Sequence, residues 1–492
     1  MALFVILLYG LCLLWIFFYS MSQLHLVWLY ARKYYLHKQI AKSALDEENL
    51  PFVTIQLPIY NELYVVEDLL NAVAAFDYPK DRFEIQVLDD SNDETVAILA
   101  AKVKALQEMG LQIEHIRRHD RVGFKAGALA YGMTLAKGEF IAIFDADFVP
   151  SPDFIRQCLP YFTNEQIGLV QARWAHINEN YSLLTKLQAL TLDAHFVVEQ
   201  LSRNDAGFFI NFNGTAGIWR LSCIESAGGW ESDTLTEDLD LSYRAQLKGW
   251  KLVFVDDILA PAELPVAMDA VKSQQFRWTK GAAEVARKIL WKVLRAPKVS
   301  FFTKLMACFH LINSSIFISV LIMSLVSLPT LWALEAHPEY QILMDIASVL
   351  FASFGIVAIF FWVAYQHTKK RSIRRFLLFF PTFLAFWAMS MAFSLHNSLA
   401  AIEGYIGKKS PFIRTPKFNL KTDKKGWKSN IYVAKRLGFL TYVEILFALY
   451  FLFGVVLAIY WQNFVMLPLH LALVLGYGGI VCYSILHQYR KA

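Results

Sequence analysis

The hydrophobic positions of the chain fall into two patterns, long apolar runs and a stretch of short alternating runs. Six runs are long enough to cross a bilayer, for which a helix needs about 20 residues. They are residues 3–31, 305–333, 342–366, 376–400, 437–461 and 464–487. Residues 32 to about 290 instead carry most of the carboxylates. The pattern predicts an integral, multi-pass membrane protein with one large polar domain.

Within the polar domain, strand-like and helix-like segments alternate. The predicted strands are FVTIQLPIY (52–60), EIQVLDDS (84–91), QIEHIRR (112–118) and FIAIFDADF (140–148). Helices are predicted from about Val65, from about Glu94 and over 124–136. Strands rich in β-branched and aromatic residues, separated by such helices, are typical of βαβ units. We therefore expect an α/β domain with a mostly parallel sheet.

Basic residues beside the apolar runs indicate which side of the membrane each segment occupies. ArgLys (32–33) follows the first run, and KTDKKGWK (421–428) precedes the fifth. Lysine and arginine favour the cytosolic side, so we expect the polar domain and segment 401–436 there. Three crossings between them would break this rule. We therefore expect run 376–400, which contains Pro381, to lie in the interface plane, leaving five spanning helices.

The same patterns give the domain boundaries. The polar domain is placed at 32–280, between the first apolar run and a stretch of interfacial helices. The full division is 1–31, a transmembrane helix; 32–280, the cytosolic domain; 281–304, interfacial helices; 305–400, transmembrane and interfacial helices; 401–436, a cytosolic segment; and 437–492, a transmembrane helix pair.

Composition excludes several other classes of protein. The chain is 56% hydrophobic and 15% aromatic, well above an ordinary soluble domain, so a lipid bilayer is an expected partner. Its net charge of +5 is mild, and no nucleic acid is expected as a partner. The cysteines form no CxxC or metal-binding spacing. Only Cys158 and Cys223 fall in the polar domain, which fits a reducing cytosol.

Acidic residues follow two of the predicted strands. Asp89 and Asp90 come after EIQVL, and Asp145 and Asp147 come after FIAIF. Ligands of parallel sheets bind at the carboxyl ends of the strands. Carboxylates spaced like Asp145 and Asp147 can hold a divalent cation that binds a nucleotide diphosphate. Each pair alone is also compatible with ordinary turn chemistry.

Two further segments offer charged side chains at predicted helix starts. Lys125, in RVGFKAGALAYG (121–132), could approach phosphate oxygens, or it could lie on a solvated helix face. In TEDLDLSYR (236–244), Thr236 is the expected N-cap, and Glu237 could serve only the helix dipole. Asp238 is the better candidate for a general base that takes a proton from an acceptor hydroxyl.

The segment SQQFRW (273–278) places polar side chains beside an aromatic ring. Arg277 offers donors that fit diphosphate oxygens, and Trp278 offers a face on which a sugar can stack. Gln274 and Gln275 can donate hydrogen bonds to hydroxyl groups. An arginine and a tryptophan at a membrane interface would be the structural alternative.

The ordered set DDS (89–91), DAD (145–147), TED (236–238) and QQFRW (274–278) resembles the membrane-embedded processive glycosyltransferases of family 2. These include cellulose synthases, cellulose-synthase-like mannan and glucan synthases, hyaluronan synthases and chitin synthases. The likeness covers roughly residues 50 to 290. It implies a Rossmann-like glycosyltransferase A-type domain joined to an α-helical transmembrane domain.

The resemblance also implies a role for individual residues. Asp238 is the implied catalytic base, and Asp145 and Asp147 are the implied ligands of Mg²⁺ or Mn²⁺. FNGTAG (212–217) is similar to the acceptor-lining stretch of the family. The implied donor residues are Asp89, Asp90, Lys125, Asp145, Gln274, Arg277, Phe412, Thr415 and Lys417. The implied acceptor residues are Asn213, Gly214, Thr215, Glu237, Gln275 and Trp278.

FIRTPKF (412–418) is similar to the gating loop of cellulose synthases, which closes over the nucleotide. Phe412, Thr415 and Lys417 match that loop. Arg414 stands where a small apolar residue is usual, so the detailed contacts of the loop are open.

By this resemblance the chain is an inverting, processive β-glycosyltransferase that polymerises a nucleotide sugar onto a growing glycan and moves the product across a membrane. UDP-glucose is the first expected donor and GDP-mannose the second. The membrane would be a bacterial inner membrane, or a Golgi or plasma membrane.

Two alternatives stay open. One is a non-processive, ceramide-type lipid glucosyltransferase. The other is a transporter with a nucleotide-sensing domain, which predicts charged residues inside the apolar runs. Those runs are nearly free of acids and bases.

Overall fold

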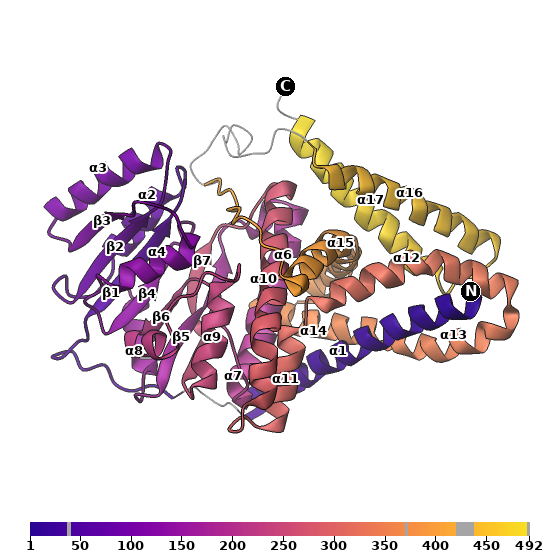
Figure 1. Cartoon of the computed structure of the whole chain (residues 1–492), viewed down its shortest axis with the longest axis horizontal. Coiled ribbons are helices and arrows are strands. Elements are labelled where there is room, and N and C mark those ends of the chain that lie inside the picture. The colour runs from indigo at the N-terminus through magenta and orange to yellow at the C-terminus, as the bar shows by residue number, and fades with distance from the viewer. Residues whose placement is uncertain (37–40, 370–371, 420–436, 490–492) are drawn as a thin grey trace.

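The structure is a computed structural model that describes residues 1–36, 41–369, 372–419 and 437–489. The basic run at 421–428, used above to assign the side of the membrane, lies outside the described residues. An α/β domain occupies one end of the molecule and a bundle of long helices the other (Figure 1). Helix α10 (Met268–Arg295) stands between them.

The described residues form one seven-stranded sheet in the order β3-β2-β1-β4-β6-β5-β7. Its strands are β1 (Val53–Ile59), β2 (Phe83–Asp89), β3 (Ile113–Arg117), β4 (Phe140–Ile143), β5 (Ile167–His176), β6 (Gly217–Arg220) and β7 (Lys251–Ala262). Every neighbouring pair within the described sheet is parallel except the two that involve β6. The mostly parallel α/β sheet predicted from the sequence is therefore confirmed.

Helices cover both faces of the sheet. In β4, Phe140 and Ala142 belong to the core on one face and Ile141 and Ile143 to the core on the other, and all four are buried. One face packs against α2 (Val66–Ala74), α3 (Thr95–Glu108) and α5 (Phe154–Cys158). The other face packs against α4 (Phe124–Met133), α8 (Leu221–Ser226) and α9 (Glu237–Leu247). The helices predicted from about Val65 and Glu94 begin within a residue of those positions.

The strand directions bring several loops to one edge of the sheet. The chain leaves β1, β2, β4, β5 and β7 at the same edge, because these strands all run in one direction. Strand β6 runs the opposite way, so the chain enters it at that edge. The segment 213–216 before β6 therefore meets the residues that follow the other strands.

Six helical segments of the described chain are long and apolar enough to cross a membrane, by length and composition. They are Ala2–Tyr34, Ser315–Ala336, Pro338–Thr368, Ile373–Ile406, Phe439–Tyr460 and Leu467–His487. In helix labels these comprise α1 (Ala2–Leu36), α12 (Ser315–Ala336), α13 (Gln341–Ser348), α14 (Ala352–Thr368), α15 (Ile373–Ile406), α16 (Phe439–Tyr460) and α17 (Leu467–Tyr489). The placement of 376–400 in the interface plane stays a prediction, because α15 has the length and apolarity of a spanning helix.

The predicted apolar run 305–333 is not one helix. It is divided between α11 (Phe301–Leu311) and α12. The polar residues at the break have partners: Ser314 Oγ lies 3.0 Å from Tyr405 Oη, and Trp15 Nε1 donates to Ser315 Oγ at 3.0 Å. These hydrogen bonds give the polar groups at the break partners, and hydropathy alone does not reveal this interruption.

The helices between the two halves also differ from the expected boundaries. Helix α10 continues without a break through the boundary expected at residue 280. Before it, α6 (Leu183–Ala194), the π-helix η3 (His195–Gln200) and α7 (Leu201–Ala206) lie against the membrane-type helices. The segment expected at 401–436 begins as the last turn of α15.

A buried ion pair fastens α10 to the C-terminal helix pair. Lys272 Nζ lies 2.7 Å from Glu444 Oε2 of α16 and 3.3 Å from Ser484 Oγ of α17. Lys272 is 7% exposed and Glu444 1% exposed. A buried pair of this kind is costly to break from one side, because the remaining charge has no partner.

We expect Lys272→Met to destabilise the protein by about 3–5 kcal/mol, because it leaves Glu444 charged and buried. The thermal unfolding midpoint of detergent-solubilised protein would measure the loss. Lys292→Met, at an exposed position of the same helix, is the matched control and should leave the midpoint unchanged. Equal midpoints for both variants would contradict a role of the pair in joining α10 to α16.

Candidate active site

A cavity of about 1250 Å³, its open mouth included, lies at the sheet edge where these loops meet. Its walls come from the ends of the parallel strands, from α9 and α10, and from the segment 412–417. Most residues selected from the sequence line it: Asp90, Lys125, Asp145, Asp147, Asn213, Gly214, Glu237, Asp238, Gln274, Arg277, Trp278, Phe412, Thr415 and Lys417.

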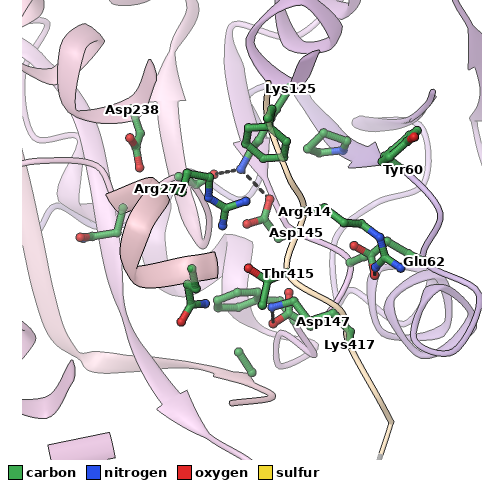
Figure 2. Close-up of a pocket in the computed structure, with 18 of the residues that line it drawn as sticks. Tyr60, Glu62, Lys125, Asp145, Asp147, Asp238, Arg277, Arg414, Thr415 and Lys417 are labelled. Atoms are coloured by element: carbon green, nitrogen blue, oxygen red, sulfur yellow. Dashed lines mark hydrogen bonds and ion pairs between the residues drawn. The ribbon is translucent and has the colours of Figure 1, made fainter. Parts of the chain in front are cut away.

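Lys125 joins two of the loops at the centre of the cavity. Its Nζ lies 2.5 Å from Asp145 Oδ1 and donates to the Gly214 carbonyl oxygen at 2.8 Å (Figure 2). Burial would lower the pKa of the Lys125 ammonium, but Asp145 and neighbouring carboxylates hold it above its usual value. Lys125 therefore remains a cation in the place where a phosphate could bind.

Asp145 and Asp147 lie in the loop after β4, as the sequence predicted. Thr215 Oγ1 accepts a hydrogen bond from the Asp145 backbone N–H at 2.8 Å, which fixes the start of this loop. Lys417 Nζ donates to Asp147 Oδ2. Both carboxylates offer the oxygen donors that Mg²⁺ and Mn²⁺ prefer, and each already contacts a cationic group. The pair therefore fits a divalent cation that takes its remaining ligands from phosphate and water.

A second cluster of acidic side chains lies away from the cavity and is paired with a lysine side chain. The carboxylates of Glu231, Asp233 and Asp240 lie close enough together to hold a metal ion. Lys288 Nζ contacts them at 2.6, 2.7 and 3.0 Å, respectively. Arg244 also contacts Glu231 and Asp240, so two cationic side chains of the chain already occupy this cluster. The cluster forms part of the contact between α9 and α10.

Glu237 and Asp238 face the cavity from the first turn of α9. Burial, together with the nearby charge of Glu237, raises the pKa of Asp238 to about 7. Burial also raises the pKa of Glu237. Thr236 precedes the helix as expected, but its side chain makes no capping hydrogen bond. It packs against Gly281 of α10, where a Cβ would lie 2.4 Å from Thr236 Cγ2.

Arg277 reaches the cavity from α10. Its guanidinium carbon lies 4.6 Å from the ring centroid of Phe412. That ring in turn stacks on Phe124 at 5.8 Å, which holds it over the start of α4. Burial lowers the pKa of Arg277, while Asp145 and Glu237 oppose the shift. The guanidinium is thus held on an aromatic face, with its N–H donors beside the carboxylates.

The segment that carries Phe412 crosses the mouth of the cavity. Arg414 Nη1 donates to Glu62 Oε2 at 2.8 Å, and Thr415 is 3% exposed. Beyond Lys417, the Asn419 backbone N–H donates to Glu263 Oε2 at 2.7 Å. Figure 2 shows Arg414, Thr415 and Lys417 over the carboxylates of the site. Arg414, which departs from the family pattern, anchors the segment to the loop after β1.

Three residues expected in the site do not line the cavity. Asp89 is the last residue of β2 and is buried, with Oδ2 2.8 Å from His115 Nε2. Thr215 is completely buried and accepts the hydrogen bond from the Asp145 backbone N–H described above. Gln275 is also absent from the lining, whereas Gln274 and Trp278 of the same helix belong to it. Side chains at neighbouring positions of a strand or helix point in different directions. Asp89 and Gln275 therefore point away from the cavity that Asp90 and Gln274 line.

Sequence reasoning missed several cavity residues: Tyr60, Glu62, Arg121, His176 and Glu263. Most follow a parallel strand, so the rule that selected Asp145 could have found them. Arg121 lies 3.3 Å from the ring centroid of Tyr60. Burial raises the pKa of Glu62 to about 7, although Arg414 opposes the shift. Arg118, which binds both carboxylate oxygens of Asp90, was also missed.

Comparison with known proteins gives the family of this domain. A family model described as "Glycosyltransferase like family 2" matches residues 51–281. Glucomannan 4-beta-mannosyltransferase 2 of Arabidopsis thaliana is 42% identical over 265 residues, 53% of this chain and 50% of the relative. Glucomannan 4-beta-mannosyltransferase 1 of Oryza sativa subsp. japonica is 42% identical over 266 residues, 53% of this chain and 51% of the relative. The chain thus spans about half the length of the curated relatives it matches.

A solved structure supports the fold. The mannosyltransferase PcManGT from Pyrobaculum calidifontis, in complex with GDP-Man and Mn²⁺, aligns with a TM-score of 0.52 at 18% identity. The alignment covers 82% of this chain and 100% of that chain. This likeness agrees with the mostly parallel sheet, whose carboxyl edge holds the cavity. Residues 51–281 belong to the family 2 glycosyltransferases and form a domain of the glycosyltransferase A type.

Proposed function

We propose that the chain is an inverting, processive β-glycosyltransferase that transfers mannose from GDP-mannose to a growing polysaccharide. One observation carries the proposal: a single cavity holds the candidate base Asp238, the cations Lys125 and Arg277, and the Asp145–Asp147 pair. A nucleotide sugar needs cations beside its diphosphate, and an acceptor hydroxyl needs a base beside the sugar.

The choice of donor rests on the relatives. Glucomannan 4-beta-mannosyltransferases are 42% identical to the domain, which favours GDP-mannose over the UDP-glucose first expected from the sequence. The motifs alone do not discriminate the two sugars, since none of them reads the configuration of the sugar ring. The curated names therefore change the preferred donor while leaving the proposed reaction unchanged.

The proposed reaction is an in-line displacement at the anomeric carbon of the donor. The acceptor hydroxyl loses its proton to the Asp238 carboxylate as its oxygen forms the new bond to that carbon. The bond from the carbon to the diphosphate oxygen breaks, and GDP leaves with the electron pair. The attack comes from the face opposite the leaving group, so the configuration inverts.

The developing negative charge on the diphosphate is stabilised by groups already fixed in place. Arg277 offers several N–H donors from its position on Phe412, and Lys125 offers its ammonium group. Removing one such fixed donor typically costs ~10²–10³-fold in rate. A divalent cation held by Asp145 and Asp147 would supply further charge stabilisation at the same oxygens.

The apolar helices give the product a route away from the site. Helix α10 joins the cavity to the membrane-type helices through Lys272 and Lys280, the latter 3.1 Å from Glu403 of α15. We place the domain on the cytosolic side and the helices across the membrane, with translocation of the polymer between them. Aromatic residues of the helices would serve as stacking surfaces for sugars.

A donor panel tests the proposal. Purified full-length protein is supplied with labelled GDP-mannose or UDP-glucose, with Mg²⁺, Mn²⁺ or EDTA, and the products are sized and digested with β-mannanase. We expect a high-mass, mannanase-sensitive product from GDP-mannose that EDTA abolishes. A glucose polymer made from UDP-glucose instead would show that the donor is UDP-glucose and not GDP-mannose. Label found only in added lipid would show that the enzyme glycosylates a lipid and does not synthesise a polymer.

Substitution of the base gives the second prediction. Asp238→Asn should lower transfer by ~10²–10⁴-fold, the usual contribution of a general base. Binding of GDP, measured by calorimetry, should stay unchanged. Asp257→Asn, at an exposed position of β7, is the matched control and should keep full activity. A parallel loss of GDP binding in Asp238→Asn would assign the residue to the donor site instead.

The pH dependence gives a third prediction. Only the deprotonated carboxylate can accept a proton, and burial raises the pKa of Asp238 to about 7. We therefore expect kcat/KM to rise with pH up to about 7 and then to level off, because this ratio reports the free enzyme. The inflection belongs to the Glu237–Asp238 pair, whose carboxyl groups titrate together. A flat profile from about pH 5.5 to 8 would contradict the assignment.

A further inference from the structure

The π-helix η3 lies immediately behind one wall of the cavity. It covers His195–Gln200, between α6 and α7. Single π-helical turns are uncommon and often occur at functional sites. Neither His195 nor Glu199 lines the cavity. His195 is nevertheless hydrogen-bonded to Asn213, which does line the cavity, and Glu199 is hydrogen-bonded to His195.

A hydrogen-bonded chain connects η3 to Asn213. Glu199 Oε2 lies 2.9 Å from His195 Nδ1, and His195 Nε2 lies 2.9 Å from Asn213 Oδ1. Asn211 Nδ2 donates to the same Asn213 oxygen at 3.0 Å. The side chains of His195 and Glu199 are 26% and 19% exposed, so little water competes for these bonds.

The ring of His195 lies between two acceptor groups. A carboxylate and an amide oxygen both accept hydrogen bonds, and an imidazole can donate to two acceptors only when both nitrogens carry a proton. The bond from Asn211 supports the orientation in which Asn213 Oδ1 faces the ring. Burial would raise the pKa of Glu199, but the hydrogen bond and charge of His195 hold it below its usual value.

These contacts of the Asn213 amide oxygen leave the amide nitrogen, Nδ2, to be considered. With its oxygen held by His195 and Asn211, Asn213 Nδ2 makes one long bond, 3.4 Å to the Asn211 carbonyl, within the described chain. Its second N–H is thus left for a ligand. The next residue, Gly214, adjoins the base: a Cβ built on it would lie 3.1 Å from Asp238 Oδ2.

We propose that His195, held by Glu199, is a positioning residue that orients the Asn213 amide so that its N–H binds the acceptor hydroxyl beside Asp238. The proposal rests on the proposed glycosyl transfer. His195 acts through Asn213 and does not contact the substrate. The amide would accept no proton itself, and it would hold the hydroxyl oxygen while Asp238 takes the proton.

The test separates acceptor binding from donor binding. His195→Phe keeps a ring beside Phe196, whose centroid lies 5.1 Å away, and removes both hydrogen bonds. We expect the KM for a β-1,4-mannan oligosaccharide acceptor to rise about 10-fold, with the KM for GDP-mannose and the Kd of GDP unchanged. His195→Gln, which restores an N–H donor, should recover most of the loss.

A double variant and a matched control complete the test. His195→Phe combined with Asn213→Ala should be no worse than Asn213→Ala alone, because both remove the same contact. The matched control is His337→Ala, which breaks a histidine–glutamate pair far from the cavity, with Glu339 at 3.1 Å. It should leave the acceptor KM, the KM for GDP-mannose and the Kd of GDP unchanged. Additive losses in the double variant, or equal behaviour of His195→Phe and His195→Gln, would overturn the proposal.

The outcomes distinguish this inference from the proposed function. A wild-type protein that transfers no sugar from any donor would refute the proposed function, and the inference with it. An active wild type in which His195→Phe leaves the acceptor KM unchanged would refute the inference alone. A fall in GDP affinity equal to the change in acceptor KM would assign His195 a general structural role.

Discussion

The common direction of the parallel strands is the constraint on which the site depends. Strands β1, β2, β4, β5 and β7 deliver their following loops to one edge, and the reversed β6 brings the segment before it to the same place. Carboxylates collected in this way would repel one another. Lys125 resolves the conflict at the centre by binding Asp145 and the Gly214 carbonyl together. The fold thus creates the cluster, and buried cations make it stable.

Charge balance also explains how such a cavity could accept a diphosphate. Lys125, Arg414 and Lys417 each pair with a carboxylate of the chain, namely Asp145, Glu62 and Asp147. A buried charge without a partner is costly, so each ammonium or guanidinium group needs one. An entering diphosphate would provide new partners without requiring the cations to move far. Fixed groups of this kind need little reorganisation when charge develops during a reaction.

The sequence predicted the site residues that are marked by a local pattern. It did not predict contacts between residues that are far apart in the chain. Asp145 and Asp147 were found because a strand of four buried residues ends just before them. Asp89 lies outside the cavity, because the last residue of β2 is buried and contacts His115. The Glu62–Arg414 pair joins residues 352 positions apart, and His195 meets Asn213 only through the packing of η3. At the break between α11 and α12, Ser314 likewise finds its partner, Tyr405, on another helix.

Helix α10 is attached to the membrane-type helices at two points. Lys272 and Lys280 attach it to α16 and α15, and Arg277 projects into the cavity between them. At 1.5 Å per residue the attachments are about 12 Å apart, too short a length for the helix to bend appreciably. A tilt of the helix bundle relative to the α/β domain would therefore also move Arg277 in the cavity. The membrane-type helices and the cavity thus share one helix, which couples the packing of the bundle to the position of a cationic side chain in the cavity.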